Sequence, residues 1–163
     1  MARQVLTDAS PLIGLSLVDG LPWLPRLFGE VGVPQEVWAE VVGRGFAGEE
    51  ALLQAQMAGW LRVYGPAPTR PALPDLDEGE AACIRLALAA KNPTLLLMDE
   101  RAGRSVALER GLQVAGTAAV IGMAKRRGLV PSAMAVFERL HRSDFRISAL
   151  VIRTVLEAVG ESS

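Results

Sequence analysis

Short apolar runs alternate with segments of helical periodicity along almost all of the 163 residues, and this alternation constrains the fold most. Such alternation is typical of α/β proteins, in which helices cover a mostly parallel sheet. The run TLLLM, residues 94–98, is apolar throughout, as expected of a strand buried on both faces. The sequence therefore predicts an α/β fold with a mostly parallel central sheet flanked by helices.

Glycines, prolines and capping residues delimit the predicted elements. Strands are predicted at Gln4–Thr7, Val31–Val33, Trp60–Tyr64, Thr94–Met98 and Leu112–Ala115. Helices are predicted at Leu12–Asp19, Trp23–Phe28, Pro34–Val42, Glu49–Ala58, Leu76–Ala90, Glu100–Arg110, Thr117 to a stop at Gly128, Pro131–Arg142 and Ala149–Val159. Ser10, Thr117 and Ser148 are the expected caps of their helices.

The length fits one domain over residues 1–163, with residues 129–163 as C-terminal helices packed on it. The proline-rich segment 65–74 suits a loop better than a domain boundary. No apolar run approaches the roughly 20 residues of a membrane span. The start MARQVLTDAS lacks the apolar core of a secretory signal, and Cys83 is the only cysteine, so a cytoplasmic protein without membrane partners is expected.

The scarcity of cysteine and histidine restricts the chemistry. A single cysteine excludes an internal disulfide and a multi-cysteine zinc site, and the single histidine, His141, excludes a ribonuclease with two catalytic histidines. Residues 1–100 hold 13 acidic and 7 basic side chains, whereas residues 101–163 hold 5 acidic and 10 basic ones. This asymmetry fits either a metal site beside a phosphate-binding surface or two solvated faces.

Two aspartates directly follow predicted strands. Asp8 follows the first strand, and Ser10 already stands where it can cap the next helix, so capping leaves Asp8 unexplained. Asp99 follows the strand TLLLM and can also cap the helix that begins at Glu100. Because ligands of open α/β sheets bind outside the carboxyl ends of the strands, neighbouring parallel strands would bring both aspartates to one crevice.

Two glutamates extend this acidic set. Helical spacing places Glu40 on the apolar stripe with Val37 and Val41, either paired with a metal or half-exposed at the edge of the stripe. Glu80 completes a capping box with Asp77 and also precedes inward-facing positions of its helix. Carboxylates that converge need a counter-ion, and a site with only oxygen ligands favours Mg²⁺ or Mn²⁺.

Several segments in order resemble the PIN-domain family, and more closely its prokaryotic branch related to VapC-type toxin ribonucleases. They are VLTDASPLIGL, VGVPQEVWAEV, LDEGEAACIRLALA, LLLMDERAGRSVALERGLQVAGT, AKRRGLVP and DFRIS. The resemblance implies a three-layer PIN-like fold and hydrolysis of single-stranded RNA that leaves 5′-phosphate and 3′-hydroxyl ends. It further implies that Asp8, Glu40, Glu80 and Asp99 are catalytic acids that hold one or two Mg²⁺ or Mn²⁺ ions.

The resemblance also assigns residues around the acids. Ser10 and Thr117 match small hydroxyl positions, and Arg104 matches a basic position of this branch; all three are expected beside the acids or facing substrate. The third acid is often aspartate in VapC toxins and is Glu80 here, one methylene longer. An antitoxin protein and a homodimer are further expectations of the family.

Basic residues offer a separate candidate surface. Lys125, Arg126 and Arg127 are predicted to contact RNA phosphates, or else to complement the dipole of the helix that ends before Gly128. Three alternatives to a toxin ribonuclease stay open: a structure-specific DNA nuclease, a non-catalytic module that binds a divalent ion or phosphate, and a partner-binding protein without activity.

Overall fold

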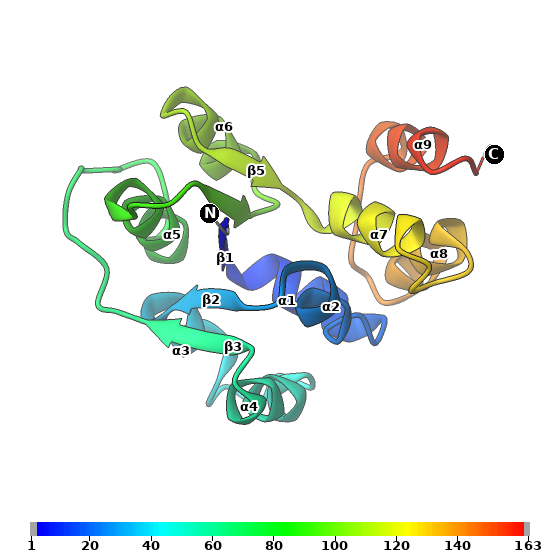
Figure 1. Cartoon of the computed structure of the whole chain (residues 1–163), viewed down its shortest axis with the longest axis horizontal. Coiled ribbons are helices and arrows are strands. Elements are labelled where there is room, and N and C mark those ends of the chain that lie inside the picture. Colours follow the sequence, from blue (N-terminus) through cyan, green and yellow to red (C-terminus); the bar gives the residue numbers. More distant parts are fainter. Residues whose placement is uncertain (1–2, 162–163) are drawn as a thin grey trace.

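A five-stranded parallel sheet forms the centre of the protein, in a computed structural model that describes residues 3–161 (Figure 1). Its strands are β1 (Gln4–Thr7), β2 (Val31–Pro34), β3 (Leu61–Tyr64), β4 (Thr94–Leu97) and β5 (Gln113–Ala115). The strand order is β3-β2-β1-β4-β5, and every neighbouring pair is parallel. The predicted α/β fold, with a mostly parallel sheet flanked by helices, is confirmed.

Helices connect and flank these strands. They are α1 (Ala9–Leu17), α2 (Trp23–Phe28), α3 (Gln35–Val41), α4 (Glu49–Ala58), α5 (Glu78–Ala89), α6 (Arg101–Glu109), α7 (Thr117–Arg126), α8 (Ala133–Arg142) and α9 (Ala149–Ala158). In Figure 1, α3 and α4 lie beside β2 and β3, whereas α7, α8 and α9 gather at the other end of the molecule. No helix within residues 3–161 is long and apolar enough to cross a membrane.

The strand order reverses between β1 and β4. The chain first adds β2 and β3 on one side of β1, and after α5 it adds β4 and β5 on the other side. Right-handed crossovers in opposite directions place the connecting helices on opposite faces of the sheet. A doubly wound sheet has its ligand crevice at such a reversal, outside the carboxyl ends of the two strands.

The core is aliphatic and continuous through the central strands. All four residues of β4 are buried, as predicted for the run TLLLM. Leu6 in β1 pairs with Leu96 in β4, and both are 0% exposed. This burial on both faces ties the position of each strand end to the packing of the whole sheet.

Two of the predicted helix caps are wrong, and two are confirmed. Helix α1 begins at Ala9 and α7 at Thr117, so the N-cap positions belong to Asp8 and Gly116 rather than to Ser10 and Thr117. Ser148 caps α9 by accepting a hydrogen bond from the Val151 backbone N–H group. The capping box of Asp77 and Glu80 is present at α5, because both of its hydrogen bonds lie within one turn.

Helices α7, α8 and α9 contact one another and are joined by Glu161. The Glu161 carboxylate accepts hydrogen bonds from the Ala133 and Met134 backbone N–H groups at 2.6 and 3.2 Å, and Lys125 Nζ lies 3.3 Å away. Burial opposes ionisation, but these donors and the ammonium outweigh it and lower the pKa of Glu161. The Glu161 carboxylate therefore links the first turn of α8 to the segment that follows α9.

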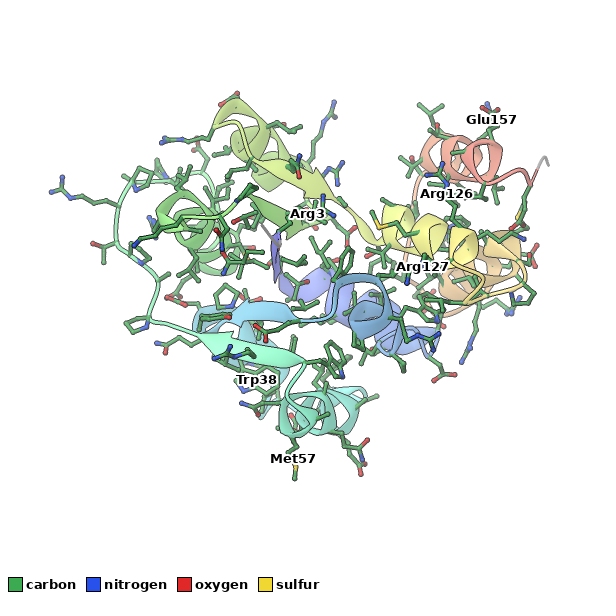
Figure 2. All side chains as sticks on the ribbon, in the orientation of Figure 1. Arg3, Trp38, Met57, Arg126, Arg127 and Glu157 are labelled. Atoms are coloured by element: carbon green, nitrogen blue, oxygen red, sulfur yellow. The ribbon has the colours of Figure 1, made fainter. Side chains whose placement is uncertain are left out.

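We expect Glu161→Ala to lower the free energy of unfolding by about 1–2 kcal/mol, because backbone N–H groups of α8 lose their acceptor. The folded pKa lies below the ordinary 4.5, so this contribution is present above pH 4.5 and disappears as pH falls through the folded pKa. Denaturant titrations at several pH values measure it. Glu157→Ala is the control, since Glu157 is exposed on α9 (Figure 2); equal effects of the two substitutions would contradict the assignment.

Candidate functional site

Asp8 lies at the carboxyl end of β1, where the strand order reverses. Its backbone N–H group donates to Leu97 O at 2.9 Å, which continues the ladder between β1 and β4. The residue is 5% exposed and occupies the N-cap position of α1, but its side chain makes no capping hydrogen bond. Asp8 is therefore a buried acid whose side chain does not cap its helix.

Glu40 reaches the same place from α3. Its neighbours Val37 and Val41 are buried whereas Glu40 is exposed, so of its two predicted placements the edge of the apolar stripe is the one observed. A Cβ atom on Gly79 would stand 2.5 Å from Glu40 Oε1 and 3.2 Å from Asp8 Oδ1. The two carboxylates thus approach one point, which is open because residue 79 is glycine.

Glu80 both caps α5 and faces the region beneath α6. Its Oε1 atom accepts a hydrogen bond from the Asp77 backbone N–H group at 3.1 Å. Its Oε2 atom would be 3.1 Å from a Cβ on Gly103, beside the sulfur of Met98. The charge of Glu80 also acts on Asp8, so Glu80 belongs to the same group of acids.

Asp99 is held by three donors. Thr117 donates from its backbone N–H group to Oδ1 at 2.7 Å and from its hydroxyl to Oδ2 at 2.8 Å, and the Ser10 hydroxyl donates to Oδ2 at 2.9 Å. Asp99 does not cap α6, because Glu100 occupies that N-cap position. The two hydroxyl residues thus contact an acid of the set, which explains why neither caps its own helix.

Arg104 and Asp99 both approach Gly116. Its Nη1 atom donates to Met98 O at 3.0 Å, and a Cβ on Gly116 would be 3.1 Å from this nitrogen and 2.9 Å from Asp99 Oδ1. Gly116 therefore lets the guanidinium group and the carboxylate approach the same stretch of backbone. The arrangement places one fixed positive charge at the rim of the acids.

Burial and mutual repulsion raise the pKa values of three acids. Burial, followed by the charges of Asp77, Glu40 and Glu80, raises the pKa of Asp8 to about 7, although a hydrogen bond from the Ala9 backbone opposes the shift. Burial is also the largest cause of the raised pKa values of Glu40 and Glu80; the Asp77 charge raises both, although the hydrogen bond from the Asp77 backbone lowers the pKa of Glu80. The carboxylates therefore share one electrostatic environment.

Asp77 is the acid that sequence reasoning missed in this set. Its role as the N-cap of α5 was predicted, but its charge also acts on Asp8, Glu40 and Glu80. The signal was its place two residues before Gly79 in the same helical turn. A capping residue was sufficient to explain the local pattern, so its contribution to the site needed the tertiary structure.

Comparison with known proteins gives one finding. A family model described as a PIN domain matches residues 4–161. This chain belongs to the PIN domain family. A search of the curated proteins finds no match. PIN domains are generally nucleases that use divalent metal ions, so nuclease chemistry is the activity with which the acids must be compared.

The acids of this PIN domain suit a hard divalent cation. Within residues 3–161, no three histidine, cysteine, aspartate or glutamate side chains are already arranged to hold an ion. Two unscreened carboxylates about 4 Å apart repel by on the order of 4 kcal/mol at an effective dielectric constant near 20. All available ligands are oxygens, and the space at Gly79 admits both Asp8 and Glu40, so the donor set fits Mg²⁺ or Mn²⁺.

Lys125, Arg126 and Arg127 lie at the other end of α7 from Thr117. Their side chains donate to backbone carbonyl groups of Pro131, Ala158 and Arg26, respectively. Figure 2 shows Arg126 directed toward α9, whereas Arg127 lies beside α7. These cations hold neighbouring segments of the PIN domain together, and their predicted contact with RNA stays a prediction.

We expect Asp8→Asn to stabilise the protein in the presence of a chelator. Because the pKa of Asp8 is raised from 3.8 to about 7 in the fold, wild-type stability falls as pH rises from about 4 to 7. The asparagine variant lacks this decline, and its free energy of unfolding at pH 8 exceeds that of wild type by roughly 3 kcal/mol. Urea titrations across this range test it, with Asp75→Asn as the exposed control; parallel pH profiles of wild type and Asp8→Asn would contradict it.

We expect Gly79→Ala to weaken Mn²⁺ binding at least tenfold, because the added Cβ would lie 2.5 Å from Glu40 Oε1 and displace it. Alanine itself favours a helix by roughly 0.5–1 kcal/mol over glycine, so the melting temperature in chelator should fall little. Isothermal titration calorimetry measures the affinity. Ala89→Ser at the opposite end of α5 serves as the control, and an unchanged Mn²⁺ affinity of Gly79→Ala would rule out this site.

Proposed function

We propose that this PIN domain is a divalent-metal-dependent endoribonuclease that hydrolyses phosphodiester bonds of single-stranded RNA. The observation that carries the proposal is the buried Asp8 carboxylate at the reversal of strand order, which approaches Glu40 at the position of Gly79. Ligands of doubly wound sheets bind at this location. A buried acid with a raised pKa and no capping role is costly to keep unless a cation binds there.

Asp8, Glu40, Glu80 and Asp99 are the residues that would hold Mg²⁺ or Mn²⁺. When bound, such an ion stabilises charge on a phosphate oxygen and lowers the pKa of coordinated water. Asp8 and Glu40 contribute carboxylates that approach one point, whereas the Oε1 atom of Glu80 already accepts a hydrogen bond from Asp77. We infer that Asp8 and Glu40 are the principal ligands.

Ser10 and Thr117 orient Asp99 in this proposal. Their hydroxyl groups both donate to Asp99 Oδ2, and the Thr117 backbone N–H group donates to Oδ1. A carboxylate fixed by three donors keeps its orientation whether or not substrate is bound. Arg104, held by Met98 O at the rim, has further N–H groups that suit an RNA phosphate.

The choice of single-stranded RNA follows the resemblance to VapC-type toxins. The same resemblance supports a role as the toxin of a toxin–antitoxin pair, with an antitoxin protein and a homodimer as partners. Lys125, Arg126 and Arg127 belong to this proposal as a more distant phosphate-binding surface. Their hydrogen bonds to backbone carbonyls mean that such contacts would use only the donors left over.

Cleavage of a fluorescent single-stranded RNA tests the proposal directly. Wild-type protein with Mn²⁺ or Mg²⁺ should cut single-stranded RNA in preference to single-stranded DNA and to duplexes of either type, and a chelator should abolish cutting. Asp8→Asn and Glu40→Gln should each reduce the rate at least a hundredfold, because each removes a charged ligand. Preference for a DNA substrate would instead identify the alternative DNA nuclease.

Measurements of Mn²⁺ binding distinguish a catalytically inactive protein from an incorrect assignment of the metal ligands. Asp75→Asn should retain wild-type cleavage, since Asp75 is an exposed acid just before α5. Mn²⁺ affinity that is lost in Asp8→Asn without any RNA cleavage by wild type would indicate the non-catalytic ion-binding module. RNA cleavage that survives in both Asp8→Asn and Glu40→Gln would refute the assignment of these acids.

A further inference from the structure

A cavity lies near the amino ends of β1, β2 and β4, the amino edge of the sheet, away from the acids. Its volume is about 630 Å³, within the range of roughly 300–1,000 Å³ usual for small-molecule sites. It is lined by Gln4 at the start of β1 and by Lys91 and Asn92 in the turn before β4. Asp8 and Asp99 follow the opposite ends of the same two strands, on the order of 13 Å away at 3.3 Å per residue.

An aromatic side chain forms one wall of this cavity. The ring of Tyr64 lies over Gly32 of β2, because a Cβ on Gly32 would be 2.5 Å from the ring atom Cε2. Phe28 adds a second aromatic group to the lining, and both rings are only half-buried. The Arg62 guanidinium group lies over the Tyr64 ring, 5.6 Å from its centroid, so Phe28 is the aromatic side chain of this cavity on which a nucleobase can stack.

Polar groups stand around these rings. Glu30 also lines the cavity, and its Oε1 atom accepts hydrogen bonds from the Tyr64 hydroxyl at 3.3 Å and from Arg62 Nη1 at 3.5 Å, which leaves Oε2 to accept from the edge of a base. Asn92 and Gln4 add amide groups. The cavity therefore combines several polar groups with apolar side chains such as Leu6 and Leu86, a mixture that is usual for small-molecule sites.

Lys91 adds a positive charge to the lining of the cavity. Lys91 is exposed at the rim and makes no hydrogen bond or ion pair among residues 3–161. The Gln4 backbone N–H group donates to Pro93 O at 2.9 Å, which holds the turn that carries Lys91 beside the start of β1. Arg3 also lines the cavity, but its Nη1 atom donates to Gln113 Oε1 at 3.3 Å. Lys91 is therefore the freer partner for a phosphate.

We propose that this cavity, which we call the amino-edge pocket, binds a nucleoside monophosphate. The base stacks on Phe28 beside Tyr64, its edge donates to Glu30 Oε2, and the phosphate pairs with Lys91. Guanine suits the pocket best, because its N1–H and N2–H groups offer adjacent donors to a carboxylate. The ligand is either a free nucleotide or the phosphorylated end of an RNA strand, and the inference does not depend on the proposed nuclease function.

Ligand binding to this pocket can be followed at Tyr64, which lines it. Tyr64 is the only tyrosine, so 3-fluorotyrosine labelling gives a single ¹⁹F resonance at the pocket wall. Titrations of the full chain in EDTA prevent metal-assisted phosphate binding at the acids. GMP, AMP, UMP and inorganic phosphate are compared, and a 5′-phosphorylated RNA dinucleotide distinguishes a strand end from a free nucleotide.

We expect GMP to shift the resonance saturably, with a Kd on the order of 0.1–1 mM and weaker binding of UMP. Lys91→Ala should weaken binding about tenfold, whereas Arg153→Ala, which removes an exposed cation from α9, should leave it unchanged. Asp8→Asn should also leave it unchanged, which separates this pocket from the acids. No saturable shift with any nucleotide, an equal shift with inorganic phosphate alone, or undiminished binding by Lys91→Ala would overturn the proposal.

Discussion

The parallel pairing of β1 with β4 is the interaction on which the candidate site depends. The Asp8 backbone N–H group continues that ladder to Leu97 O, so the acid that follows one strand is held beside the end of the other. Both strands are buried within the sheet, and neither end can shift without disturbing the core. Acids placed at this reversal are therefore rigidly positioned by packing that has no role in their chemistry.

The protein accommodates each acid in a different way. Asp99 is neutralised in part by three hydrogen-bond donors, and Glu80 uses one oxygen for the cap of α5. Glu40 retains solvent exposure, whereas Asp8 is buried with its pKa near neutrality. The cost of burying a negative charge, with repulsion added to it, thus falls most heavily on Asp8. A local conflict that the fold tolerates at one residue is typical of a functional site.

Features that depend on nearby residues were predicted from the sequence, and features that depend on distant ones were not. The capping box at Asp77 and the cap at Ser148 were predicted because their donors and acceptors lie within one turn. Ser10 and Thr117 were misassigned as caps because a residue far along the chain, Asp99, accepts their hydroxyl hydrogens instead. Hydrophobic periodicity left open whether Glu40 is buried or exposed, since a residue at the edge of an apolar stripe is buried or exposed according to what packs beside it.

By itself, the sequence determined the alternation of strands and helices, the position of an aspartate after each of two strands, and the restriction to oxygen ligands. These follow from period, composition and local capping chemistry. Only the tertiary structure decided that β1 and β4 are neighbours, that Gly79 leaves room for two carboxylates, and that a separate cavity opens beside Tyr64. Strand order and close approach arise from long-range packing, which local patterns do not encode residue by residue.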